Sequence, residues 1–125
     1  MKTISIKHIT DLHSDSLRGL DFYAQELDIL QGRLQEILAD NTGEEVAEQV
    51  EHFQNQFIIQ RHAIEELRGE ILENNSMITE QVMESGGVEK KTIAENNNLH
   101  GDYLTEEKII NDLRHEFYRF ASKWM

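Results

Sequence analysis

The sequence contains no cysteine and no proline, and each absence excludes a class of structure. Without cysteine, the chain forms no disulfide, holds no metal through thiolates and has no cysteine nucleophile. Without proline, its helices avoid a residue that costs about 3 kcal/mol in a helix interior. The composition therefore favours long helices without interruption.

Long apolar runs and basic side chains are also scarce. No stretch approaches the roughly 18 apolar residues of a membrane span, and the first residues lack the apolar segment of a signal peptide. The 24 acidic side chains outnumber the 12 basic ones, which gives a formal net charge of -12. Such a chain repels nucleic-acid backbones and anionic membranes. We expect a cytoplasmic protein whose partner is neither nucleic acid nor membrane.

The size and the apolar content indicate one folded domain. A chain of 125 residues can bury one sizeable core but not two, so we assign residues 1–125 to a single domain. Hydrophobic residues make up 38% of the sequence, which is enough to fold despite the charge.

What the chain has in abundance is apolar residues at helical spacing. Three stripes alternate between spacings of three and four residues, the pattern of a heptad repeat. They comprise Leu20, Tyr23, Leu27, Leu30, Leu34 and Ile37; then Val46, Val50, Phe53, Phe57, Gln60, Ile64, Leu67, Ile71, Asn74, Ile78 and Gln81; and finally Leu99, Tyr103, Glu106, Ile110, Leu113, Phe117, Phe120 and Trp124. The stripes predict an all-α fold, an antiparallel up-down-up three-helix bundle with coiled-coil-like packing.

Local signals set the expected helix boundaries at about 8–40, 43–84 and 102–124. Thr42 and Glu45 have the spacing of a capping box at the start of the second helix. Gly86 or Gly87 can adopt the left-handed conformation that ends it. Residues 85–101 are either a connection or an extension of the third helix, and the asparagines at 96–98 favour the later start because they compete with helix.

The short connection between the first two helices also predicts their register. If one helix ends near Asp40 and the next begins near Gly43, the numbers of facing residues add up to roughly 83. Phe57 would then lie near Leu27, and Ile71 near Leu12.

The six histidines do not have the spacing of a metal site on one helix. No Glu-x-x-His motif occurs, and no two histidines are three or four residues apart. Of the histidines within the predicted helices, only His13 projects close to an apolar stripe, while His62 and His115 project to the opposite side. We therefore predict no metal site and no cofactor, and solvated or structural roles for the histidines.

Gln60 and Asn74 interrupt the second stripe with polar side chains. Such residues usually fix the register of packed helices or remain partly exposed. No acid or base on the same face accompanies them, and the sequence lacks a phosphate-binding glycine loop or a nucleophile elbow. We therefore predict a protein that is not an enzyme.

Among the apolar residues outside the stripes, four are displaced far from the stripe centres of the first two helices: Phe22, Ile29, Ile58 and Ile59. The predicted register puts them at neighbouring heights. A three-helix core with wide stripes could absorb them, or they could form an exposed patch that binds protein. The favoured hypothesis is an adaptor or self-associating bundle that acts through a protein partner or as a homo-oligomer. The alternative is a metal-binding bundle that uses acids such as Glu26, Glu70 or Asp102 with His13 or His100.

Overall fold

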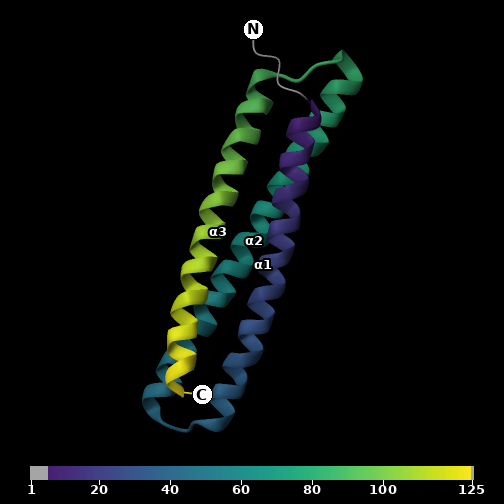
Figure 1. The fold of residues 1–125 in the computed structure, drawn as a ribbon. Coiled ribbons are helices and arrows are strands. Elements are labelled where there is room, and N and C mark those ends of the chain that lie inside the picture. Colours follow the sequence, from purple (N-terminus) through teal and green to yellow (C-terminus); the bar gives the residue numbers. More distant parts are fainter. Residues whose placement is uncertain (1–5, 125) are drawn as a thin grey trace.

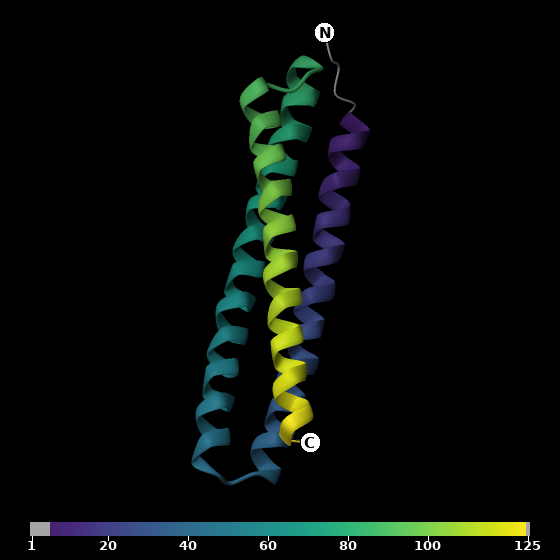
Figure 2. The ribbon, with the colours of Figure 1, turned by 60° about the vertical axis from the view of Figure 1, so that its left-hand side comes forward.

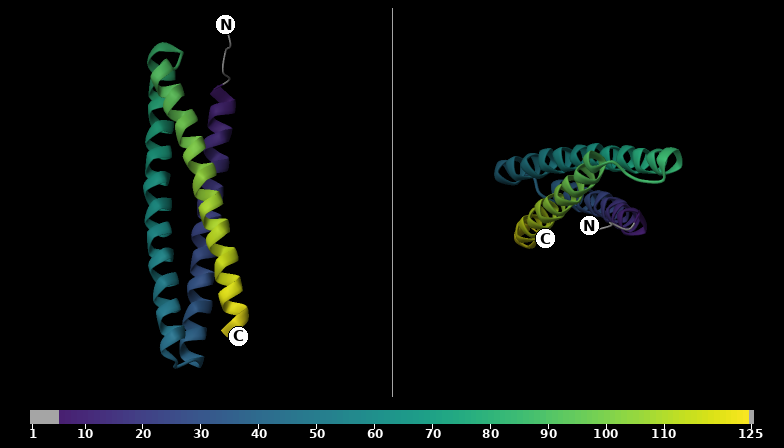
Figure 3. Two further views of the ribbon diagram at one scale, coloured as in Figure 1. Left: turned by 90° about the vertical axis from the view of Figure 1, so that its left-hand side faces the viewer. Right: turned by 90° about the horizontal axis from the view of Figure 1, so that it is seen from above.

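Three long helices make up the fold. The computed structural model describes residues 6–124, which form α1 (Ile6–Asp40), α2 (Glu44–Ser85) and α3 (Lys90–Trp124), with no strand among them. The chain runs down α1, up α2 and down α3 in one elongated bundle (Figures 1 and 2). Each helix packs against the other two, and α3 is inclined to α2 (Figure 3). The predicted three-helix bundle is confirmed.

No helix in residues 6–124 combines the length and the apolar character that a membrane crossing would need.

The core follows the predicted stripes. The buried residues of α1 and α2 recur at alternating spacings of three and four, as the heptad pattern requires. At the end of the bundle where α1 connects to α2, four phenylalanines pack together: Phe53, Phe57, Phe117 and Phe120. Their ring centroids are 5.0–6.2 Å apart in edge-to-face and tilted pairs, geometries that aromatic quadrupoles favour.

At the opposite end, polar side chains are buried beside Ile9 and Ile78. His13, Asn74 and Thr92 come from the three different helices and are at most 3% exposed. His13 Nε2 and Asn74 Oδ1 are 2.7 Å apart, and Asn74 Nδ2 donates to the Thr92 carbonyl oxygen at 3.3 Å. Since the amide nitrogen of Asn74 is directed to Thr92, its oxygen accepts from His13. One asparagine thus links all three helices.

The ends of α2 agree in part with the sequence signals. Gly86 has φ 77° and donates its amide to the Val82 carbonyl at 2.8 Å, so the predicted left-handed end is confirmed. The predicted capping box is wrong. Gly43 is the cap residue, and no side chain within residues 6–124 caps the helix. Thr42 lies one residue too early for its hydroxyl to serve as the cap.

α3 begins at Lys90, twelve residues before the predicted start at 102. The preference of the asparagines for turns is overridden by packing, because Thr92, Asn96 and Leu99 continue the buried stripe. Gln81 of α2 holds this first turn, since its Nε2 donates to Thr92 Oγ1 at 2.9 Å and its Oε1 accepts from the Glu89 amide at 3.0 Å. Residues 90–101 are therefore an extension of the helix.

The register of α1 against α2 differs from the prediction by about one helical turn. The contacts of Asp28 with Arg61, Asp21 with Arg68 and His13 with Asn74 join residues whose numbers add up to 87–89, not to about 83. The prediction placed the start of α2 at Gly43, whereas Gly43 has extended backbone (φ -72°, ψ 150°) and α2 begins at Glu44, which accounts for part of the difference.

Candidate functional site

All four apolar residues predicted outside the core are exposed in this chain. The exposed fractions are 53% for Phe22, 54% for Ile29, 50% for Ile58 and 54% for Ile59. A wider core therefore does not absorb them. Whether they bind a partner depends first on which of them share a face.

The ion pairs between helices define three outer grooves, which we call seams. The α1–α2 seam contains the pairs of Asp21 with Arg68 and of Asp28 with Arg61. The α1–α3 seam contains Arg114 and Glu26, 3.4 Å apart. The α2–α3 seam contains Glu45 with Lys123, 3.4 Å apart, and His52 with Glu116, 3.3 Å apart. These pairs show which flank of each helix faces which neighbour.

Phe22 and Ile29 lie on the α1–α3 seam. They are four residues before and three residues after Glu26, so they flank it on the same side of α1. The Phe22 ring also packs edge-on against Tyr23, with centroids 5.2 Å apart, and the Tyr23 hydroxyl accepts from Asn111 of α3 at 3.4 Å.

Ile58 and Ile59 point away from that seam and from each other. Ile59 is seven residues after His52, so it lies on the α2–α3 seam. Ile58 is three residues before Arg61, so both lie on the side of α2 that faces the α1–α2 seam. The four predicted residues are therefore distributed over three seams and do not form one patch.

Two further apolar residues complete the α1–α3 seam from α3. Leu104 and Tyr118 are seven residues before and after Asn111, and they are 49% and 41% exposed. The only interhelical ion pair that this seam shows within residues 6–124 is Glu26 with Arg114, whose side chains are just 16% and 28% exposed. We define Phe22, Ile29, Leu104 and Tyr118 as the α1–α3 face. Leu104 and Tyr118 are not among the four interface residues predicted from the sequence, although both lie outside the third stripe.

The α2–α3 seam contains an acidic cleft, defined by Glu66, Glu70, Asp102 and Glu106. It encloses about 190 Å³, and Ala63 and Leu67 line it as well. Glu106 is 7% exposed, and its Oε1 has no hydrogen-bond partner among residues 6–124. Burial raises the pKa of the Glu106 carboxyl above its usual value. The sequence stripe had included Glu106 as its one charged member.

The five residues of the metal hypothesis lie in different places. Glu26 pairs with Arg114, and His13 bonds to Asn74. Glu70 and Asp102 meet in the acidic cleft, whereas His100 does not line it. Nowhere in the described part of the chain do three or more histidine, aspartate or glutamate side chains converge as metal ligands.

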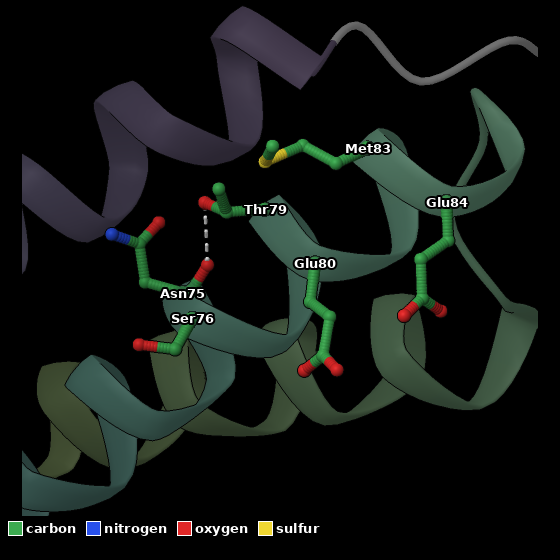
Figure 4. Close-up of a pocket in the computed structure, with 6 residues that line it drawn as sticks. All are labelled: Asn75, Ser76, Thr79, Glu80, Met83 and Glu84. Atoms are coloured by element: carbon green, nitrogen blue, oxygen red, sulfur yellow. Dashed lines mark hydrogen bonds between the residues drawn. The ribbon is translucent and has the colours of Figure 1, made fainter.

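A larger hollow of about 450 Å³ lies on the last turns of α2 (Figure 4). Its lining comes from this helix alone: Asn75, Ser76, Thr79, Glu80, Met83 and Glu84. The Thr79 hydroxyl donates to the Asn75 carbonyl at 3.0 Å, and Glu80 and Glu84 extend to the side opposite Met83. The Thr79 hydroxyl is thus engaged with the backbone of its own helix, and no residue of α1 or α3 lines the hollow.

Tyr103 is the residue with the largest change in acidity. Its hydroxyl donates to Glu107 Oε2 at 3.1 Å. Burial, and secondarily the hydrogen bond and the charge of Glu107, raises the pKa of Tyr103 to about 12. A phenol this weakly acidic stays protonated at neutral pH, so its role is that of a hydrogen-bond donor between turns of α3.

Comparisons of the chain with protein-family models, with curated proteins and with solved structures found no match.

Proposed function

We propose that this chain is a non-enzymatic cytoplasmic bundle that acts through protein–protein contact, with a partner chain or a second copy, and that the α1–α3 face is its contact surface. The observation that carries the proposal is the exposure of Phe22, Ile29, Leu104 and Tyr118 along one seam. Exposed apolar residues that cluster on a soluble bundle are typical of surfaces that bind protein.

A comparison of the three seams supports this choice. The α1–α2 seam carries two ion pairs whose side chains are 40–62% exposed, and the α2–α3 seam carries two pairs that are 50–67% exposed. Bringing these solvated charges into an interface would cost desolvation energy. On the α1–α3 seam, the interhelical pair found within residues 6–124 is already shielded, and the exposed pair of Asp15 with Arg18 lies nearer the start of α1. A partner that covers Phe22, Ile29 and Tyr118 therefore gains mostly apolar burial.

Two of the six histidines are held in contacts between helices. His13 is hydrogen-bonded to Asn74, and His52 is paired with Glu116 on the surface. A general base needs a free ring nitrogen directed at a substrate site. These two rings are instead engaged in contacts between helices.

The test compares substitutions on different seams. We expect Phe22→Glu and Tyr118→Glu to abolish association, measured by light scattering for a second copy and by a photo-crosslinker at position 22 for another protein. Ile58→Glu is the matched control, because Ile58 is equally exposed on the α1–α2 seam. A strict monomer at all concentrations that forms no crosslink from position 22 would contradict the proposal. If Ile58→Glu weakens association as much as Phe22→Glu does, the contact surface is not specific to the α1–α3 face.

A further inference from the structure

A regular ladder of residue pairs crosses the α2–α3 seam. Its first two pairs are Glu45 with Lys123 and His52 with Glu116. From one pair to the next, the residue number increases by seven on α2 and decreases by seven on α3. The same step brings Ile59 opposite Ile109, and one step further it brings Glu66 opposite Asp102. The ladder therefore changes from complementary charges to like charges at the acidic cleft.

The like charges in the cleft have no counterion within the described residues. Glu66 and Glu70 are four residues apart on α2, and so are Asp102 and Glu106 on α3. Like charges at this spacing destabilise a helix, and here two such pairs face each other. No arginine or lysine lines the cleft, and none of the four acids forms an ion pair among residues 6–124.

Glu106 supplies an independent sign that something binds there. It lies at the base of the cleft, more than nine-tenths buried, and its Oε1 lacks a partner within the described chain. A buried carboxylate without a donor costs free energy that a bound cation would recover. The neighbouring buried positions of α3 hold Leu99, Ile110 and Leu113. A carboxylate among them opposes stability, which is characteristic of binding sites.

The shape of the cleft favours an organic cation over a metal ion. Calcium and magnesium need several oxygens at about 2.0–2.6 Å from one point, and the acids in residues 6–124 do not converge in that way. A volume of about 190 Å³ accommodates several water-sized groups. Ala63 and Leu67 offer methyl groups to a methylene chain, while the carboxylates on both helices can accept from ammonium groups.

We propose that the acidic cleft between α2 and α3 is a binding site for a linear polyamine. Its ammonium groups lie between Glu66 and Asp102 and beside Glu70, and one reaches Glu106. Its methylene chain lies against Ala63 and Leu67. This site is separate from the α1–α3 face, so the two assignments stand or fall independently.

The test is calorimetric titration of the full chain with spermidine at low ionic strength, where surface charge is least screened. We expect saturable one-to-one binding. Asp102→Asn and Glu66→Gln each remove one charge-assisted hydrogen bond, which should weaken binding about tenfold. Both side chains are exposed, so the variants should fold. Melting curves of the same samples check this.

The control separates a built site from general attraction to an acidic protein. Glu48→Gln removes the same charge from the outer surface of α2 and should leave binding within about twofold. Equal weakening in Glu48→Gln, or absence of saturable binding, would overturn the proposal. Displacement of spermidine by an equal concentration of Mg²⁺ would overturn it too, since the site would then take any cation. Butylamine, with one ammonium group, should bind more weakly than spermidine.

Discussion

Glu106 shows how one residue can couple folding to pH. Its carboxyl pKa is raised in the folded chain because burial disfavours the charged form. The folded state therefore keeps a proton that the unfolded state has already released. Unfolding free energy must then fall as pH rises from the ordinary glutamate range through the raised pKa.

We predict that Glu106→Gln removes this part of the pH dependence. Urea unfolding of the wild type and of Glu106→Gln at a series of acidic pH values measures it. As pH rises above the ordinary glutamate range, the unfolding free energy of the wild type should fall more steeply than that of the variant. Glu106→Leu should raise the unfolding free energy at neutral pH by about 1–3 kcal/mol, because an unpartnered buried carboxylate is replaced by an apolar side chain. A loss of stability in Glu106→Leu would show that the carboxylate has a partner in solution.

The buried contact of His13 with Asn74 is a second effect at the residue scale. We predict that His13→Leu or Asn74→Leu alone costs about 1–3 kcal/mol, since each leaves a buried polar partner unsatisfied. The double substitution should cost less than the two single effects combined. A double-mutant cycle by urea unfolding measures this coupling. The exposed pair of His52 and Glu116 provides the comparison, with an expected coupling below about 1 kcal/mol.

At the scale of the helices, two glycines distinguish the effect of intrinsic helix propensity on stability from the effect of packing. Gly19 of α1 lies under Tyr103 of α3, so a Cβ built on it would come 2.6 Å from the Tyr103 Cζ. Gly69 of α2 has nothing within 4 Å of such a Cβ. Both are interior helical positions, where alanine is intrinsically favoured over glycine.

We predict that Gly69→Ala stabilises the protein by about 0.5–1 kcal/mol, whereas Gly19→Ala destabilises it because the Tyr103 ring must move. Thermal unfolding of the two variants measures the difference. In a Tyr103→Ala background, Gly19→Ala should become stabilising like Gly69→Ala. If Gly19→Ala stabilises the unaltered chain, α1 and α3 are less closely packed than the structure shows.

The helices also show where local signals fail. The apolar spacing predicts that three helices exist, because heptad positions depend only on neighbours along the chain. It does not predict that α3 begins at Lys90, since that start depends on contacts of Thr92 with Asn74 and Gln81 from another helix. The same holds for the register of α1 and α2, which is seen only in the contacts between the two helices.

At the scale of the whole molecule, the core is aromatic at one end and includes buried polar side chains at the other. Phe117 is fully buried between Phe53 and Phe57. We predict that Phe117→Ala costs about 3–5 kcal/mol, which is a large part of the stability of a typical domain. Circular dichroism during heating measures it. Phe22→Ala, on the exposed α1–α3 face, should change stability by less than about 1 kcal/mol. Similar losses in both would mean that Phe22 is also covered.

The candidate sites depend on this same whole-molecule arrangement. The exposure of Phe22 and Ile29 follows from their angular distance from the apolar stripe around the axis of α1, and this angle can be read from the sequence. The separation of Ile58 from Ile59 depends on which neighbour lies on each flank of α2. The acidic cleft brings Glu66 opposite Asp102, two residues whose positions in the chain give no sign of proximity.

By itself, the sequence determined the helices, the buried stripe of each and the side chains left outside, because a periodicity of 3.6 residues fixes the angle of every side chain around its own axis. Only the tertiary structure decided which flanks face each other and how far each helix is displaced along its neighbour. Those two choices depend on the handedness of the bundle and on the geometry of its connections. They place four apolar residues on the α1–α3 face and four carboxylates around one cleft.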